Sequence, residues 1–271
     1  MALIYQVISP SNNHLSYLMG TFHLLIPEFA PLLNQAEDLI AQCTKYFGEM
    51  DLTQVDPQIL YLTQQNLPKP GKKLLKTLIE RQPYFVKNNL SFPAYPEQTA
   101  IFNLYNELTL SLWKRKLMNG SVDEELLKIA LKQNKPIGGI ESFEKQIEIM
   151  NLIDFKEMEK QLINMLHHPK KFSKKMDFLL SLYLNGKIHK LSRETEKTSK
   201  SNKEVMITQR NKEFTNKIEH IIQETNNTFI SFGAGHLGGK DGVIKSLKKK
   251  GYTISKLNKN ISNFAFELIF F

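Results

Sequence analysis

The sequence contains a single cysteine, Cys43, and lacks any long apolar run. One cysteine excludes an intramolecular disulfide, which fits a reducing compartment. No stretch approaches the roughly 20 apolar residues that cross a bilayer, and the N-terminus lacks the basic and apolar regions of a signal peptide. The sequence as written therefore predicts a cytoplasmic protein without a membrane anchor. Export stays open if the N-terminus has been trimmed.

Two further features are missing. No H-E-x-x-H segment occurs, which excludes a zincin-type metal helix. No arginine-rich helix or aromatic RNA-binding motif accompanies the net charge of +9, and the lysines are spread over many short clusters. We therefore interpret the charge as a solvated surface and expect no nucleic-acid partner. Nothing in the sequence indicates an oligomeric state.

The elements that are present alternate between strands and helices. Two short strands at 3–10 and 15–20 predict a hairpin. The pattern then predicts the following: a helix at 31–43, a strand ending at Glu49, a helix at 121–134 with Ser121 and Glu124 as capping box, a strand ending at Glu141, a polar stretch at 191–204 that is either a loop or the start of a solvated helix, an amphipathic helix at 204–226, a strand at 227–233, a helix at 240–251, and final strands at 252–257 and 264–271.

One pattern occurs twice, more than two hundred residues apart. "YLMGTFH" places Gly20 and His23 after an apolar run, and "FISFGAGH" does the same with Gly233 and His236. Each is followed by a helix and a strand. If the strands are parallel, both histidines leave the carboxyl edge of one sheet, where open α/β sheets place their sites. We expect a mixed sheet built from two related strand–G-x-x-H–helix–strand halves.

Acidic residues are expected at the same edge, because Glu49 and Glu141 also end predicted strands. Imidazole binds metals and acts as a base near neutral pH, and carboxylates can do either. From the residues alone each histidine could equally be a packed or capping residue. Glu141 could equally complement the dipole of the helix that follows it.

Five segments in order resemble the TraB/GumN family, also called Tiki-like or PrgY-type. They are "YLMGTFHLL", "YFGEMD", "NKPIGGIESFEKQI", "MITQRNKEF" and "GAGHLGGKDGVIKSLKKKGYTI". Members of this family resemble metal-dependent peptidases. The resemblance implies a Tiki/erythromycin-esterase-like α/β fold in one domain over residues 1–271. Mainly helical segments, about 53–135 and 143–225, would partly form a cap over the site.

The resemblance also implies roles for individual residues. His23, His236 and Glu49 would hold a divalent metal, Mn²⁺, Co²⁺ or Zn²⁺. Glu49, Glu141 and Arg210 would be catalytic, the carboxylates as bases and the arginine at an oxyanion. Asn211, Gly235 and Gly238 would contact the substrate, a peptide or a small amide or ester.

Three functions remain open at this point. The first is a metal-dependent hydrolase that cleaves peptide or related amide bonds with metal-activated water. The second is an esterase-like hydrolase without a metal, in which His23 or His236 is the general base. The third is a non-catalytic protein that binds peptides and limits a pheromone signal, as some relatives are associated with doing.

Overall fold

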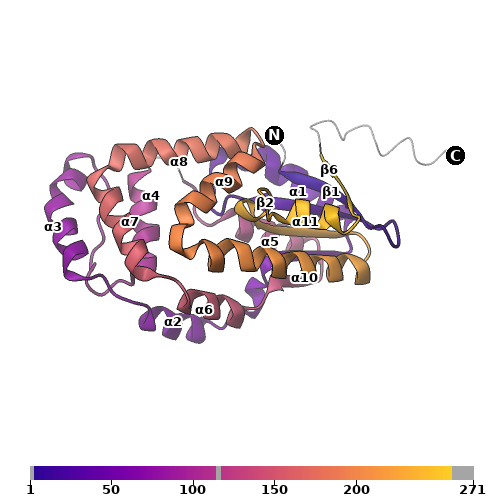
Figure 1. Ribbon diagram of the computed structural model, residues 1–271, viewed down its shortest axis with the longest axis horizontal. Coiled ribbons are helices and arrows are strands. Elements are labelled where there is room, and N and C mark those ends of the chain that lie inside the picture. The colour runs from indigo at the N-terminus through magenta and orange to yellow at the C-terminus, as the bar shows by residue number, and fades with distance from the viewer. Residues whose placement is uncertain (1–2, 114–116, 258–271) are drawn as a thin grey trace.

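The computed structural model describes residues 3–113 and 117–257. These residues form a mixed α/β fold with six strands and eleven α-helices (Figure 1). The strands are β1 (Ile4–Ile8), β2 (Leu15–Thr21), β3 (Lys45–Met50), β4 (Ile137–Glu141), β5 (Thr228–Gly233) and β6 (Thr253–Lys256). The helices are α1 (Ala30–Gln42), α2 (Pro57–Asn66), α3 (Lys72–Lys87), α4 (Ile101–Leu112), α5 (Val122–Lys132), α6 (Phe143–Asn151), α7 (Phe155–His167), α8 (Pro169–Leu184), α9 (Ile188–Ser199), α10 (Arg210–Glu224) and α11 (Val243–Lys249). The predicted strand at 264–271 lies outside the described residues.

All six strands belong to one sheet with the order β4-β3-β5-β2-β1-β6. Strands β4, β3, β5 and β2 are parallel to one another, and β1 is antiparallel to both β2 and β6. The predicted hairpin of β1 and β2 is therefore confirmed. Every residue of the central strand β5 is buried, as expected for a parallel strand covered on both faces.

The strand order explains why helices cover both faces. The connection from β2 through α1 to β3 runs toward one edge of the sheet, and the connection from β5 through α11 to β6 runs toward the other. Because such crossovers between parallel strands are right-handed, they place α1 and α11 on opposite faces. Consistently, α1 contacts α5 and α10 contacts α11.

The same order brings the two G-x-x-H segments together. Strands β2 and β5 are parallel neighbours, with Thr21 opposite Gly233. Both strands end at one edge, and β3 and β4, which carry Glu49 and Glu141, end there as well. Because these four strands run in the same direction, side chains from four distant parts of the chain lie at one edge of the sheet.

A second hydrophobic cluster lies outside the one that surrounds the sheet. It joins α3, α4 and α7 through buried residues such as Leu78, Leu104 and Leu162. Figure 1 shows these helices at the end of the molecule away from the strands, with α8 running between the two parts. They belong to the segments 53–135 and 143–225. The capping role of these segments and the single-domain organisation stay predictions.

Two local predictions need correction. Of the two alternatives for the polar stretch 191–204, the loop is wrong, because most of the stretch belongs to the helix α9, and the helix is not fully solvated, because Leu191 and Ser192 are buried. The helix expected from residue 204 begins as a π-helical segment, Glu204–Gln209, and becomes α-helical at Arg210. The capping box of α5 is confirmed, and Cys43 is buried.

The described helices include no candidate membrane-spanning segment. Across residues 3–113 and 117–257, none of them combines the length and the apolar character that crossing a bilayer requires.

Candidate functional site

His23 lies in a tight turn immediately past β2. Its φ angle is 64°, in the left-handed region that non-glycine residues rarely adopt. The Leu24 N–H donates to the Phe22 carbonyl oxygen at 2.8 Å, which closes a three-residue turn around the histidine. The Val122 N–H donates to the His23 carbonyl oxygen at 3.1 Å and ties the turn to the start of α5. Strained backbone held by such contacts clusters at functional sites.

The His23 ring is paired with Asp123. Its Nδ1 lies 2.9 Å from Asp123 Oδ2, and because a carboxylate only accepts, Nδ1 is the donor. Desolvation favours the neutral ring, but the hydrogen bond and charge of Asp123, together with the charge of Glu49, outweigh it and raise the pKa of His23 to about 9. The side chain stays 60% exposed. The other Asp123 carboxylate oxygen is buried and has no hydrogen-bond partner among the described residues.

His236 is buried and held in one tautomer. It follows β5 in a short 3₁₀ turn, Ala234–His236, and its Nδ1 lies 2.7 Å from Asn211 Oδ1. The Asn211 amide nitrogen donates to the Asp241 carbonyl oxygen at 3.0 Å, so the amide oxygen faces the ring and Nδ1 is the donor. Burial, with the charges of Arg210 and His23, lowers the pKa of His236 to about 3. At neutral pH, Nε2 of His236 is therefore an unprotonated nitrogen.

Glu49 connects the two motifs. One carboxylate oxygen accepts from the Gly233 N–H at 2.8 Å, and the other accepts from Arg210 Nη2 at 2.5 Å. Burial alone would raise the pKa of this carboxyl group. The charges of Arg210, His23 and His236 and the Gly233 hydrogen bond prevail and lower the pKa to about 2. Glu49 is thus a fixed negative charge between two histidines.

Arg210 stands behind Glu49, at the start of α10. Its Nε and Nη2 donate to the two oxygens of Glu141, at 2.9 and 2.7 Å. The guanidinium also lies 5.0 Å from the centre of the Phe214 ring, and that ring lies 5.0 Å from the ring of His236. Both oxygens of Glu141 are therefore engaged by the arginine, and one buried cluster supports both Glu49 and His236.

The motif glycines provide space, and neither needs a left-handed backbone. A Cβ on Gly233 would lie 2.9 Å from His23 Nε2 and 3.4 Å from Glu49 Oε2, so both atoms lie beside Gly233. A Cβ on Gly20 would collide with Leu237, next to His236 in the chain. In the first motif the residue with positive φ is His23 itself.

A cavity opens beside His23 and Glu49. It has a volume of 240 Å³ and is lined by His23, Glu49, Asp123, Tyr46 and neighbouring residues. A larger groove of 570 Å³, with mainly apolar walls, shares Met50, Leu52, Glu124, Leu127 and Gln146 with it. The carboxylate and the exposed histidine therefore face a space that continues into an apolar groove.

The remaining predicted residues support the site from outside. Asn211 is buried and holds the His236 ring. Gly235 and Gly238 have their nearest neighbours on α9, because a Cβ on either would lie 3.0 Å from Thr195 or from the Ile188 carbonyl oxygen. These two glycines let α9 approach the loop that carries His236.

Sequence reasoning missed two residues of this arrangement. Asp123 pairs with His23, and Gly233 donates to Glu49. Asp123 is one of three acids in the first turn of α5, where acids are common because of the helix dipole. Asp123 lies outside the G-x-x-H motifs, so no other feature of the sequence indicated that it pairs with His23. The sequence indicates Gly233 as the glycine of the second G-x-x-H motif, but not its hydrogen bond to Glu49.

The donor atoms fit a divalent ion in kind. His23 and His236 each engage Nδ1 with an oxygen acceptor, the arrangement that orients imidazoles for metal binding through Nε2. Glu49 adds a carboxylate. As the side chains lie, no group of three or more His, Cys, Asp or Glu residues within 3–113 and 117–257 is close enough to enclose an ion. The exposed ring of His23 is the one with room to adjust.

A family model and a curated protein both match this chain. The model of the TraB/PrgY/gumN family matches residues 4–256. A protein from Amphimedon queenslandica named "Metalloprotease TIKI homolog" is 25% identical over 206 residues, which cover 73% of this chain and 35% of the relative. The chain thus spans about one third of the length of that curated relative.

Proposed function

Since the chain belongs to the TraB/PrgY/gumN family, we propose that it is a hydrolase of peptide or related amide bonds that depends on a divalent metal ion. The observation that carries the proposal is that His23 Nε2 and Glu49 Oε2 both lie beside Gly233, three residues before His236, whose ring is held through Nδ1 by Asn211. The relative named as a metalloprotease homolog supports the same reaction class.

His23, His236 and Glu49 are the residues that would hold the ion. With two nitrogens and a carboxylate, Mn²⁺ and Co²⁺ are as suitable as Zn²⁺. A bound ion supplies a Lewis acid that polarises the scissile carbonyl group and lowers the pKa of water. The chain itself supplies Asp123 and Asn211, which orient the two rings, and such outer partners commonly change metal affinity or activity by 10–100-fold.

The other charged residues have different tasks in this proposal. Arg210 keeps Glu49 ionised at every physiological pH, since it lowers the pKa of that carboxyl group. Glu141 positions Arg210 and is not free to take a proton from water, because both its oxygens accept from the arginine. Asp123 lines the cavity and holds the His23 ring through its other carboxylate oxygen, Oδ2.

The apolar groove gives the proposal a substrate preference. It continues from the cavity along α2, α5 and α6 and is lined by residues such as Val55, Leu60 and Ile147. An extended peptide with its scissile bond at Glu49 would place neighbouring side chains there. We therefore expect cleavage next to apolar residues.

We also propose that the two G-x-x-H segments are related halves. The first half comprises β2, His23, α1 and β3. The second comprises β5, His236, α11 and β6. In each the strand, the histidine, the helix and a second strand of the same direction follow one another.

A metal-free mechanism is the second candidate, and the pairing of His23 with Asp123 favours it. A histidine whose Nδ1 donates to a carboxylate is the arrangement of a general base or acid. In that mechanism Nε2 of His23 would take a proton from water only in the fraction of molecules whose ring is neutral, because the pKa of His23 is about 9, and an ester or lactone would be the substrate.

Chelation separates the two candidates. We expect the purified chain to cleave quenched peptides that contain apolar residues, to lose cleavage on dialysis against a chelator, and to regain it with Mn²⁺, Co²⁺ or Zn²⁺. His236→Ala is expected to lose at least about 100-fold in kcat/KM. His220→Ala, on the exposed surface of α10, is the matched control and is expected to retain activity.

Other results would redirect the assignment. Cleavage that survives in metal-free protein but disappears in Asp123→Asn would select the metal-free mechanism. Stoichiometric peptide binding without turnover of any amide or ester would contradict both and leave a binding protein.

A further inference from the structure

The helix α2 forms one wall of the apolar groove that continues from the cavity of the proposed metal centre. Leu60, Thr63 and Gln64 line the groove from this helix, at spacings that place them on one helical face. Only residues 51–56 separate the helix from β3, the strand that carries Glu49. A movement of α2 would therefore change the groove beside the proposed centre.

This helix is weakly attached to the rest of the protein. Among the α-helices within residues 3–113 and 117–257, α2 alone buries none of its residues. In the same part of the chain, no hydrogen bond or ion pair joins residues 57–66 to another helix or strand. Its four consecutive apolar side chains are all exposed: Ile59, Leu60, Tyr61 and Leu62. Short helices depend on tertiary packing, and segments with few buried apolar contacts open at low cost in free energy.

The chain on either side of α2 is fixed. Before the helix, Met50 belongs to β3 and lies opposite Glu141 of β4 in the sheet. After the helix, Leu67 is buried, and the Pro68 carbonyl oxygen accepts from the Ile101 N–H at 2.9 Å, which ties the chain to the start of α4. A loosely packed helix between two anchored points is the arrangement of a lid that moves while its ends stay in place.

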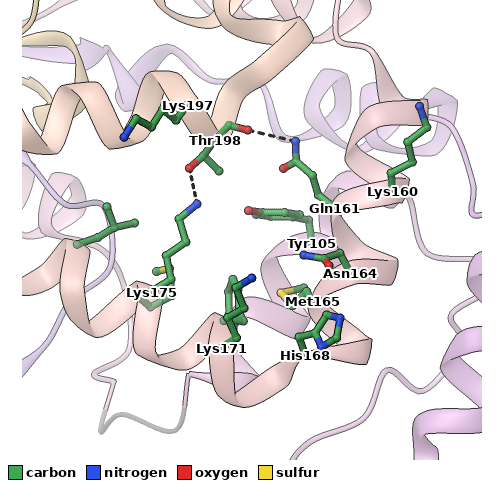
Figure 2. Close-up of a pocket in the computed structure, with 13 residues that line it drawn as sticks. Tyr105, Lys160, Gln161, Asn164, Met165, His168, Lys171, Lys175, Lys197 and Thr198 are labelled. Atoms are coloured by element: carbon green, nitrogen blue, oxygen red, sulfur yellow. Dashed lines mark hydrogen bonds between the residues drawn. The ribbon is translucent and has the colours of Figure 1, made fainter.

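The cavity between α4, α7, α8 and α9 has the opposite construction (Figure 2). Its volume is 380 Å³, and its walls are linked by hydrogen bonds between helices. Lys175 Nζ on α8 donates to Thr198 Oγ1 on α9 at 2.7 Å, and Gln161 on α7 donates to the Thr198 carbonyl oxygen at 3.2 Å. Bonds of this kind hold three helices of that wall together. The described residues of α2 have none to the facing wall of the groove, so α2 is the wall that can move.

We propose that α2 is a lid that closes on the apolar side chains of a bound peptide, and that Leu60 is the lid residue that selects them. The facing wall of the groove, on α4, α5 and α6, is apolar and includes Phe102, Leu127, Phe143 and Ile147. A peptide between the two walls gives α2 the apolar partner that it lacks in the peptide-free protein. This inference rests on the proposed function, since the peptide that closes the lid is the proposed substrate.

Amide hydrogen exchange of residues 57–66 tests the lid. The wild-type chain is first dialysed against a chelator, so that the proposed reaction does not consume the peptide. We expect fast exchange in α2 without peptide. Saturating acetyl-Gly-Leu-Val-Leu-Val-Gly-amide is expected to slow this exchange about tenfold or more, because closure buries the helix. The same peptide with serine in place of leucine and valine is expected to leave the exchange unchanged.

Two leucines on α2 provide a matched pair of variants. Leu60 lines the groove and is 38% exposed, whereas Leu62 is 52% exposed and does not line it. Leu60→Gln is expected to weaken binding of the leucine–valine peptide about tenfold and to remove most of the protection of α2, because the apolar contact of the leucine is lost. Leu62→Gln makes the same chemical change on the same helix and is expected to leave binding and protection unchanged.

Three results would each overturn the lid. They are exchange in peptide-free α2 as slow as in the buried strand β5, exchange in α2 that the leucine–valine peptide does not change, and equal weakening of binding by Leu60→Gln and Leu62→Gln. The proposed function fails separately from the lid. Protection of α2 without hydrolysis after Mn²⁺, Co²⁺ or Zn²⁺ is restored would keep the lid and reject the hydrolase. Hydrolysis without protection would reject the lid alone.

Discussion

Gly233→Ala is expected to lower kcat/KM for peptide hydrolysis by about 100-fold or more while the protein stays folded. The added Cβ would lie 2.9 Å from His23 Nε2, closer than two such atoms can approach, and 3.4 Å from Glu49 Oε2. The His23 side chain is 60% exposed and will move away. Misplacement of a catalytic group by about 1 Å typically costs two orders of magnitude in rate.

Stability distinguishes this effect from general damage. The φ angle of Gly233 is −51°, which alanine adopts without strain, so the thermal midpoint should change by only a few degrees. Gly71→Ala is the matched control, because its Cβ would also meet a side-chain atom at 3.0 Å, Glu159 Oε1, far from the site. It should retain full activity. Full activity in Gly233→Ala would show that His23 and Glu49 do not act together.

Arg210→Met is expected to reduce the free energy of unfolding by about 3–5 kcal/mol. The arginine neutralises Glu49 and Glu141, whose side chains are only 15% and 3% exposed. Its removal leaves two carboxylates inside the protein without their cation, and methionine has a similar length but no donor. Urea denaturation at neutral pH measures the loss. Arg193→Met, on the exposed face of α9, should change stability by less than about 0.5 kcal/mol.

The loss in free energy of unfolding caused by Arg210→Met should depend on pH. In the wild type the folded pKa of Glu49, about 2, lies below its ordinary value of 4.5. The resulting stabilisation is fully present above pH 4.5 and is lost as pH falls toward 2. In the variant the Glu49 carboxyl group loses the charge of Arg210 and becomes easier to protonate. The difference between the two proteins should therefore be largest at neutral pH and shrink below pH 4.5. A difference that is constant from pH 7 to pH 3.5 would contradict the assigned role.

Much of the sheet could be predicted from the sequence because its strands carry short apolar runs with clear ends. The repeated G-x-x-H pattern and the strand-end acids Glu49 and Glu141 predicted a shared rim, and β2, β5, β3 and β4 do end at one edge. Because parallel strands run in the same direction, motifs at their carboxyl ends lie at the same edge of the sheet. The role of the site residues stays a prediction.

The sequence could not show how the site is held. Asp123 lies a hundred residues from His23, and its position in a helix first turn already explains an acidic residue there. The polar stretch 191–204 indicated a loop or the start of a solvated helix, because it carries few apolar residues. Its small side chains instead contact the glycine-rich loop that carries His236, and Ser192 accepts a hydrogen bond from the Gly238 N–H. Such tertiary contacts produce no periodic residue pattern in the sequence.

The most direct test of the central claim, that the two motif histidines and Glu49 form one metal centre, is anomalous diffraction from crystals soaked in Mn²⁺. The proposal predicts a single strong peak at the Mn edge contacted by His23, His236 and Glu49, and its loss in His236→Ala crystals. Crystals that take up no Mn²⁺ there, or that bind it only at surface carboxylates, would contradict it.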